Sequence, residues 1–338
     1  MHRVTRRFAM LAAAAALFVA ATAQAQVHEH TIKFATQNPK GHPITMGMEK
    51  FAEIVAARSG GKIKVNLYPG GVLGGDAPNV SAIQGGTLEM ASMNSGILAS
   101  EVKEFAIYDF PFMFASPQEA DAVVDGPFGK MMHAKLQAKG IVGLAYWELG
   151  FRNITNSRHP IRTVDDIKGL KLRVIPNAIN VDWVTALEAN PTPLAFPEVY
   201  SALEQKAIDG QENPFTVIDA NKFYEVQKYL AITNHQYNPQ SIIISKKFWD
   251  TLTNDEKKIL EDAAIEAGAY ERKLSREQAG AALADLKKHG MEVTEFSPAE
   301  MAKFRDKMKP VIAKYTAIVG ADTVNMLQSE LAKLRSGK

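Results

Sequence analysis

Cysteine is absent from this chain of 338 residues. Its absence excludes a disulfide scaffold, a thiolate zinc site and a cysteine nucleophile. The chain also has no excess of charge, since 39 Lys and Arg residues stand against 37 Asp and Glu residues. Its hydrophobic and charged fractions, 46% and 22%, are near globular averages and exclude a disordered, collagen-like or coiled-coil chain. The length predicts two domains.

The N-terminus has the pattern of an export signal. Three arginines at positions 3, 6 and 7 precede an apolar run over 8–21, and the triplet AQA then ends at Ala25. The run is shorter than the ~20 residues that span a bilayer, which disfavours the alternative of an uncleaved anchor. We expect residues 1–25 to be a signal peptide, cleaved after Ala25. The remaining 36 basic and 37 acidic residues give no bias toward nucleic acid, and we expect a soluble periplasmic protein.

Hydrophobic periodicity predicts an α/β fold with helices on the faces of a sheet. Strands are expected at 30–35, 62–67, 88–93, 141–146, 170–174, 229–233, 241–245 and 292–296. Helices are expected at 45–58, 78–84, 118–124, 129–139, 179–189 and 198–207, and again from 297 onward. The segment 254–289 predicts one helix about 50 Å long. No polar linker or internal repeat interrupts the chain.

Catalytic and cofactor signatures are missing. The eight histidines form no H-E-x-x-H motif, and no G-x-S-x-G elbow is present. His28-Glu29-His30 could bind a metal, but it is interpreted as a solvated chain start because no further cluster of ligands accompanies it. The glycine-rich segment 70–75, followed by Asp76, is neither a dinucleotide fingerprint nor a P-loop. It is interpreted equally as a mobile loop or as backbone close to a ligand, with Asp76 accepting hydrogen bonds from hydroxyls. We expect no cofactor, no metal and no enzymatic activity; a periplasmic enzyme is the alternative class.

Two arginines are candidate anion ligands. Arg152 follows a predicted strand, and Arg173 lies inside one, KLRV. A guanidinium on a strand can hold a carboxylate through two parallel hydrogen bonds. The residues alone favour a surface arginine at 173, since most arginines are exposed. Asn213 could supply an amide to an anion, and Trp147 or Phe196 could be core residues or an apolar wall for a ligand.

Several long strings carry a family resemblance. They are YPGGVLGG, FPFMF, GFRNITNSRHPI, GLKLRVIPNAIN, AIDGQENP and KFYEVQKYL, and they extend over essentially the whole chain after residue 25. The chain resembles the solute receptors of tripartite ATP-independent periplasmic (TRAP) transporters, of the dicarboxylate-receptor (DctP) type.

The resemblance implies a type II periplasmic-binding-protein fold, with two α/β lobes around a ligand cleft and a long helix spanning both lobes. Lobe I would comprise residues 26–149 plus 238–278, and lobe II residues 150–237 plus 279–338. Such receptors bind small organic acids and deliver them to a membrane permease driven by an ion gradient. We expect a monomer whose partners are a carboxylate ligand and the permease subunits, with no nucleic acid.

The resemblance also assigns site residues. Arg173 matches the family arginine that forms the salt bridge to the ligand carboxylate, and Arg152 matches a second arginine. The other matched or neighbouring candidates are Asn213 on the carboxylate, Phe196 against the ligand, Asp76 and Asn94 at positions that read the rest of the ligand, Tyr237 and His235 near the hinge, and Trp147. We predict a sugar acid such as a uronate or aldonate. The alternatives are a C4-dicarboxylate, for which Lys171 is the candidate second cation, sialic acid, which Asn94 disfavours, or a role as ligand sensor for a membrane kinase.

Overall fold

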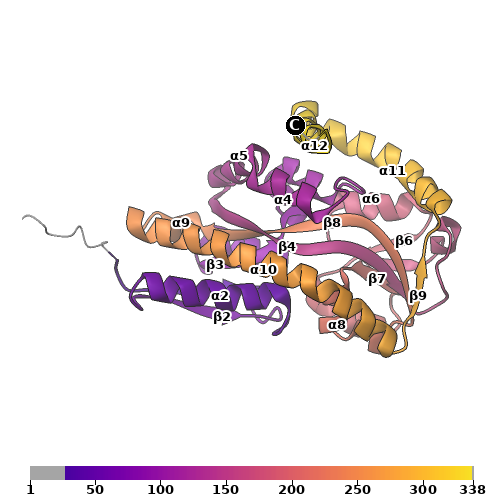
Figure 1. Ribbon diagram of the computed structural model, residues 1–338, viewed down its shortest axis with the longest axis horizontal. Coiled ribbons are helices and arrows are strands. Elements are labelled where there is room, and N and C mark those ends of the chain that lie inside the picture. The colour runs from indigo at the N-terminus through magenta and orange to yellow at the C-terminus, as the bar shows by residue number, and fades with distance from the viewer. Residues whose placement is uncertain (1–26, 337–338) are drawn as a thin grey trace, which may run out of the picture.

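A computed structural model describes residues 27–336 as a nine-stranded mixed sheet with helices on both faces (Figure 1). The strands are β1 His30–Ala35, β2 Ile63–Tyr68, β3 Met90–Asn94, β4 Ile141–Asn156, β5 Lys171–Val174, β6 Asn190–Pro193, β7 Gly210–Asn213, β8 Tyr229–Ser245 and β9 Glu292–Glu295. The α/β prediction is confirmed. The predicted signal peptide lies outside the described residues.

The helices include those predicted and two short ones, α8 and α9, that were not. The described helices are α2 Pro43–Arg58, α3 Asp76–Gly85, α4 Pro117–Asp125, α5 Pro127–Leu136, α6 Ala178–Ala186, α7 Val199–Glu204, α8 Phe215–Ala220, α9 Lys246–Trp249, α10 Asn254–Lys288, α11 Pro298–Val319 and α12 Ala321–Arg335. Within residues 27–336, none is both long and apolar enough to cross a membrane.

Two long antiparallel strands, β4 and β8, form the middle of the sheet. The strand order is β2-β1-β3-β8-β4-β7-β5-β6, so a parallel group of strands lies on each side of this pair. The sequence pattern predicts two separate strands within β8 and an end of β4 at residue 146. Both predictions were wrong because the polar residues in the middle of these strands bond to one another across the sheet. Register shifts between Glu148 and Gly150 and between Arg152 and Ile154 bend the pair.

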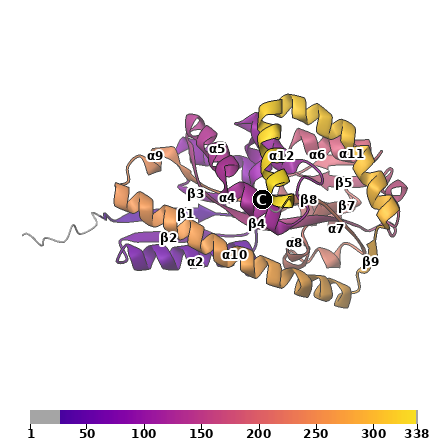
Figure 2. The same ribbon diagram turned by 45° about the horizontal axis from the view of Figure 1, so that its top comes forward.

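The apolar core is divided between the two faces of the sheet. One buried cluster includes Phe51, Trp147 and Leu260, under the face that carries α2, α8 and α10. The other includes Phe128 and Phe304, under the face that carries α4, α5, α6, α11 and α12. Figure 2 shows these two helical layers on opposite sides of the strands. Each face is thus covered by segments from distant parts of the chain.

Helix α10 confirms the predicted long helix to within one residue at its C-terminal end. A reciprocal capping box opens it, in which the Thr253 side chain accepts from the backbone of Glu256 and the Glu256 carboxylate accepts from the backbone of Thr253. The helix runs diagonally across the whole molecule, from the α2 side to β9 (Figures 1 and 2). It therefore ties together the two strand groups on either side of β4 and β8.

Candidate functional site

Strand β5 places Arg173 in the interior with its side chain only 2% exposed. Its Nε donates to the carbonyl of Leu194 at 2.9 Å, and its Cζ lies 5.7 Å from the ring centroid of Phe196. No carboxylate among residues 27–336 forms an ion pair with it. Burial, together with the charge of Arg152, lowers the pKa of Arg173 to about 10. The chain thus holds a buried cation whose charge no ion pair balances.

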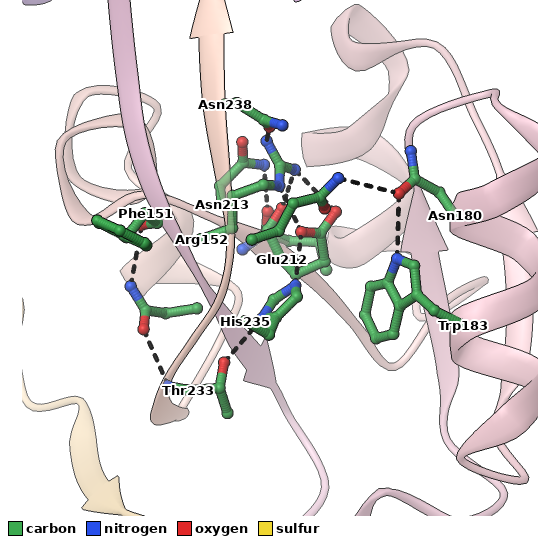
Figure 3. A network of polar contacts seen from close by, with 12 residues as sticks. Phe151, Arg152, Asn180, Trp183, Glu212, Asn213, Thr233, His235 and Asn238 are labelled. Carbon is green, nitrogen blue, oxygen red and sulfur yellow. Dashed lines mark hydrogen bonds and ion pairs between the residues drawn. The ribbon is translucent and has the colours of Figure 1, made fainter. Parts of the chain in front are cut away.

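Arg152, by contrast, has an ion-pair partner among the neighbouring side chains (Figure 3). Its Nε and Nη2 both contact the Glu212 carboxylate, the Nη2–Oε1 distance being 2.7 Å, and its Nη1 donates to Asn238 at 2.7 Å. His235 lies 3.2 Å from the same carboxylate. Burial alone would raise the pKa of Glu212, but Arg152 and His235 lower it to about 2. Arg152 is therefore ion-paired with Glu212 and hydrogen-bonded to Asn238 within a buried network.

Asp76, at the start of α3, brings an acceptor toward Arg173. Its Oδ2 accepts from the backbone N–H of Asn94 and from the Gln37 amide, both at 3.2 Å. Its Oδ1 is buried without a hydrogen-bond partner. Burial raises the pKa of Asp76 to about 7, although the Asn94 hydrogen bond and the charge of Arg173 oppose the rise. A buried acceptor of this kind is suited to a donor such as a hydroxyl.

Asn94 and Asn213 lie in the same buried polar region. The amide of Asn94 donates to Asn238 at 2.9 Å, and its carbonyl caps the following 3-10 helix by accepting from Gly96 at 2.8 Å. Asn213 ends β7, next to Glu212 in the chain, and its amide donates to Gln211 at 2.5 Å. Both asparagines are at most 2% exposed. Asn238 thus links the Arg152 network to the residues beside Asp76.

Phe196 provides an apolar surface beside Arg173. It opens the short 3-10 helix Phe196–Glu198, and its ring centroid lies 6.0 Å from that of Phe223. The glycine-rich loop reaches the same segment: a Cβ added at Gly71 would meet the Pro197 ring at 2.9 Å. Gly71 also has a φ of +72°, which side chains rarely adopt. The predicted loop therefore approaches the segment that carries Phe196.

Two predicted site residues have other contacts. The indole N–H of Trp147 donates to the carbonyl of Ala264 on α10 at 2.9 Å, so this side chain packs between β4 and the long helix. The Tyr237 hydroxyl donates to Glu148 at 3.1 Å, and its ring packs on Phe151 at 5.1 Å. The polar atoms of both side chains are thus bonded within the protein, and their role in lining the ligand stays a prediction. Lys171 is exposed and offers no second buried cation.

Three participating residues were not singled out from the sequence: Glu212, Asn238 and Asp109. Asp109 accepts from Asn238 at 3.2 Å and from Asn177 and Asn180 at 2.9 Å each. Glu212 lies inside the GQENP string, but its partner on β4 emerges only from the pairing of β4 with β7. Buried polar residues need partners, but the sequence by itself does not identify which residue pairs with Glu212.

The arrangement of side chains around Arg173 by itself indicates a class of protein. The site combines the buried guanidinium of Arg173, the unpartnered Oδ1 of Asp76 and the ring of Phe196. It belongs to a sheet whose two groups of strands are connected by the bent strands β4 and β8 and crossed by the long helix α10. This arrangement can hold a small anion that also carries hydrogen-bond donors. The site is therefore that of a binding protein for an anionic solute.

Comparison with known proteins gives the family. Residues 34–317 match the bacterial extracellular solute-binding protein family 7, DctP, and the chain belongs to this family. It is 35% identical to the 2,3-diketo-L-gulonate-binding periplasmic protein YiaO of Escherichia coli (strain K12) over 82% of this chain and 86% of that protein. The resemblance to TRAP solute receptors is confirmed.

Solved structures share the fold over nearly their full length. A TRAP periplasmic solute-binding protein from Ochrobactrum anthropi, with a C-terminus bound in its ligand-binding pocket, is 54% identical with a TM-score of 0.82, covering 93% of this chain and 98% of that one. The sugar acid binding protein DctPAm from Advenella mimigardefordensis, in complex with galactonate, is 41% identical with a TM-score of 0.90, covering 91% and 99%. These matches confirm the two-lobe periplasmic-binding-protein fold.

Proposed function

We propose that this protein captures a hydroxylated monocarboxylate, a sugar acid such as an aldonate or uronate, and delivers it to the membrane permease of a TRAP transporter. The observation that carries the proposal is Arg173, which is buried, positively charged and without an ion-pair partner among the described residues. A ligand carboxylate supplies the missing charge through a bidentate pair with the guanidinium. The galactonate complex of DctPAm supports the choice of ligand class.

The roles of the other residues follow from their contacts. Arg152 acts as a positioning residue, since Glu212 and Asn238 use its donors. Asn213 offers its amide group near the carboxylate, and Phe196 packs against the carbon chain. Asp76 accepts a ligand hydroxyl at its unpartnered Oδ1. Each polar group that loses water on binding then has a partner.

The same residues disfavour a C4-dicarboxylate. A second carboxylate needs a second cation, and Arg152 is already neutralised while Lys171 is exposed. The carboxylate of Asp76 would repel a second ligand carboxylate, which needs a cation beside it. A sugar acid needs one cation and several acceptors, which this site supplies.

Lobe closure transmits the signal to the permease. The predicted lobe boundaries after residues 149 and 237 meet in the sheet, because Gly150 and Asn238 are paired across β4 and β8. A register shift and a φ of +110° at Gly150 mark this point as a bend. Ligand that contacts both lobes favours the closed form by the contacts that only this form makes.

Export is part of the proposal. Members of the family are extracellular or periplasmic binding proteins, and the matched YiaO is periplasmic. We propose cleavage after Ala25, which N-terminal sequencing of periplasmic protein tests. A mature chain beginning at Met1 would contradict it.

A thermal-shift panel tests the ligand class. It compares D-galactonate, D-galacturonate, succinate, malate and galactose on the purified protein. A ligand at 100 times its Kd adds about 2.7 kcal/mol of stability, which is readily detected. The proposal predicts the largest shift for a sugar acid, a smaller one for the dicarboxylates and none for galactose. A shift with galactose and none with any acid would contradict it.

A further inference from the structure

Three side chains with metal-binding atoms meet at the start of the described chain, away from the solute site. His28 lies just before β1, His30 is the first residue of β1, and Glu256 comes from the first turn of α10. The Glu256 Oε1 lies 3.3 Å from Nδ1 of His28 and 3.2 Å from Nε2 of His30. All three donor atoms lie within 4.8 Å of one another.

These separations are those of ligands around one small cation. In a tetrahedral zinc site with bonds of about 2.0–2.2 Å, neighbouring ligand atoms lie about 3.3–3.6 Å apart. The His28–Glu256 distance of 3.3 Å lies within this range, and the His30–Glu256 distance of 3.2 Å lies 0.1 Å below it. Two imidazoles and one carboxylate also form a donor set that zinc takes in proteins, with water in the fourth position.

The carboxylate is held in place before any ion arrives. Glu256 is fully buried; its Oε2 accepts from the backbone of Thr253 at 2.7 Å, and its Oε1 accepts from the backbone of His28 at 2.5 Å. The His30 ring packs edge-on against Phe248 at 5.6 Å. Such outer contacts orient the ligands of a metal site. The side chain of His28 is 53% exposed, so one side is open to an entering ion and to water.

We propose that His28, His30 and Glu256 bind one Zn²⁺ that fastens the start of the mature chain to the first turn of the long helix. The ion replaces the contacts between the imidazoles and the carboxylate with metal–ligand bonds. His30 begins β1, and Gln37, which bonds to Asp76, lies just past the other end of that strand. At ~3.3 Å per residue the strand alone separates them by about 17 Å. Zinc binding therefore acts on stability and leaves solute capture unchanged.

Calorimetric titration of the purified protein with ZnCl₂ tests the site. The protein used for this titration has a few residues added before Gln26, because a free α-amino group close to His28 could itself bind the metal. We expect one zinc per chain and a rise in Tm of about 3–6 °C at 100 times Kd. Titration with Co²⁺ is expected to give the intense visible absorption of tetrahedral cobalt.

Two variants and one control separate this site from adventitious binding. His28→Ala lies at the exposed start of the chain, so it retains the fold, and it is expected to weaken zinc binding at least tenfold. Glu256→Gln retains an oxygen for the capping box but removes the anionic ligand, and it is expected to do the same. His159→Ala removes an exposed histidine elsewhere and is expected to change nothing. Equal zinc binding by the wild type and His28→Ala, or no binding by the wild type, would overturn the proposal.

Discussion

Replacing Arg173 by alanine removes the one buried cation that has no ion-pair partner among residues 27–336 and is expected to abolish tight ligand binding. The Nε of Arg173 is committed to Leu194 at 2.9 Å, which leaves the terminal nitrogens for the ligand carboxylate. Without them the ligand carboxylate loses water at a buried position and lacks its strongest partner. Truncating one member of a buried charge pair costs about 2–5 kcal/mol, which is about thirty-fold to several thousand-fold in Kd.

The unliganded variant is expected to stay folded. Burial and the charge of Arg152 lower the pKa of Arg173, which means that its positive charge is unfavourable in the absence of an anion. Alanine loses the contact with Phe196 but relieves this repulsion. Loss of affinity and loss of fold are therefore separable in this variant.

Calorimetric titration with a sugar acid, beside melting curves of the unliganded proteins, checks the prediction. Arg173→Lys keeps the charge but loses the planar fork, so we expect intermediate affinity. Arg173→Met keeps most of the volume without charge and should bind as poorly as alanine. Arg158→Ala removes an exposed arginine and serves as the matched control. A Kd for Arg173→Ala within threefold of wild type would refute the reasoning.

Three further predictions concern stability. Glu212→Ala leaves a buried guanidinium without its counter-charge, and denaturant unfolding should show a loss of about 3–5 kcal/mol; an unchanged midpoint would contradict the buried network. Gly268→Ala should destabilise the protein by about 1–3 kcal/mol, because the added Cβ would lie 2.7 Å from Trp147. Gly280→Ala on the same helix should stabilise it by about 0.5–1 kcal/mol, because the added Cβ would have no neighbour within 4 Å. Stability changes of the same sign in both variants would contradict the packing of α10 described above. Burial raises the pKa of Asp76 from 3.8 to about 7, so the folded chain keeps a proton that the unfolded chain releases, and the free energy of unfolding should fall as the pH rises from about 4 to about 7. Asp76→Asn should reduce this dependence of the unfolding free energy on pH, as measured by denaturant unfolding across that range. An unchanged pH dependence in the variant would contradict the prediction.

Local patterns were sufficient for most of the fold. Alternation predicted β2, and the cap at Thr253 with the long periodic segment predicted α10 almost to the residue. The long strands β4 and β8 were missed because Glu148, Arg152 and the run from His235 onward look like strand ends. Their partners come from strands far away in the chain, and periodicity within one strand does not reveal them.

Single site residues could be predicted from the sequence, but their partners could not, because these come from distant strands. Arg173 was identified through its family string, and the structure places it in the interior without an ion pair among residues 27–336. Arg152 was identified too, but its role depends on Glu212, whose distance from it is set by strand pairing. The sequence also did not reveal that the polar atoms of Trp147 and Tyr237 are bonded to Ala264 and Glu148, which lie far from them in the chain.

Calorimetric titration of the wild-type protein with D-galactonate and with galactitol tests the central claim most directly. The two ligands share the hydroxylated carbon chain, and only galactonate carries a carboxylate. The account predicts one-site binding of galactonate at micromolar Kd or tighter and no measurable binding of galactitol. Galactitol binding as tight as that of galactonate would contradict it, because the unbalanced charge of Arg173 would then have no part in capturing the solute.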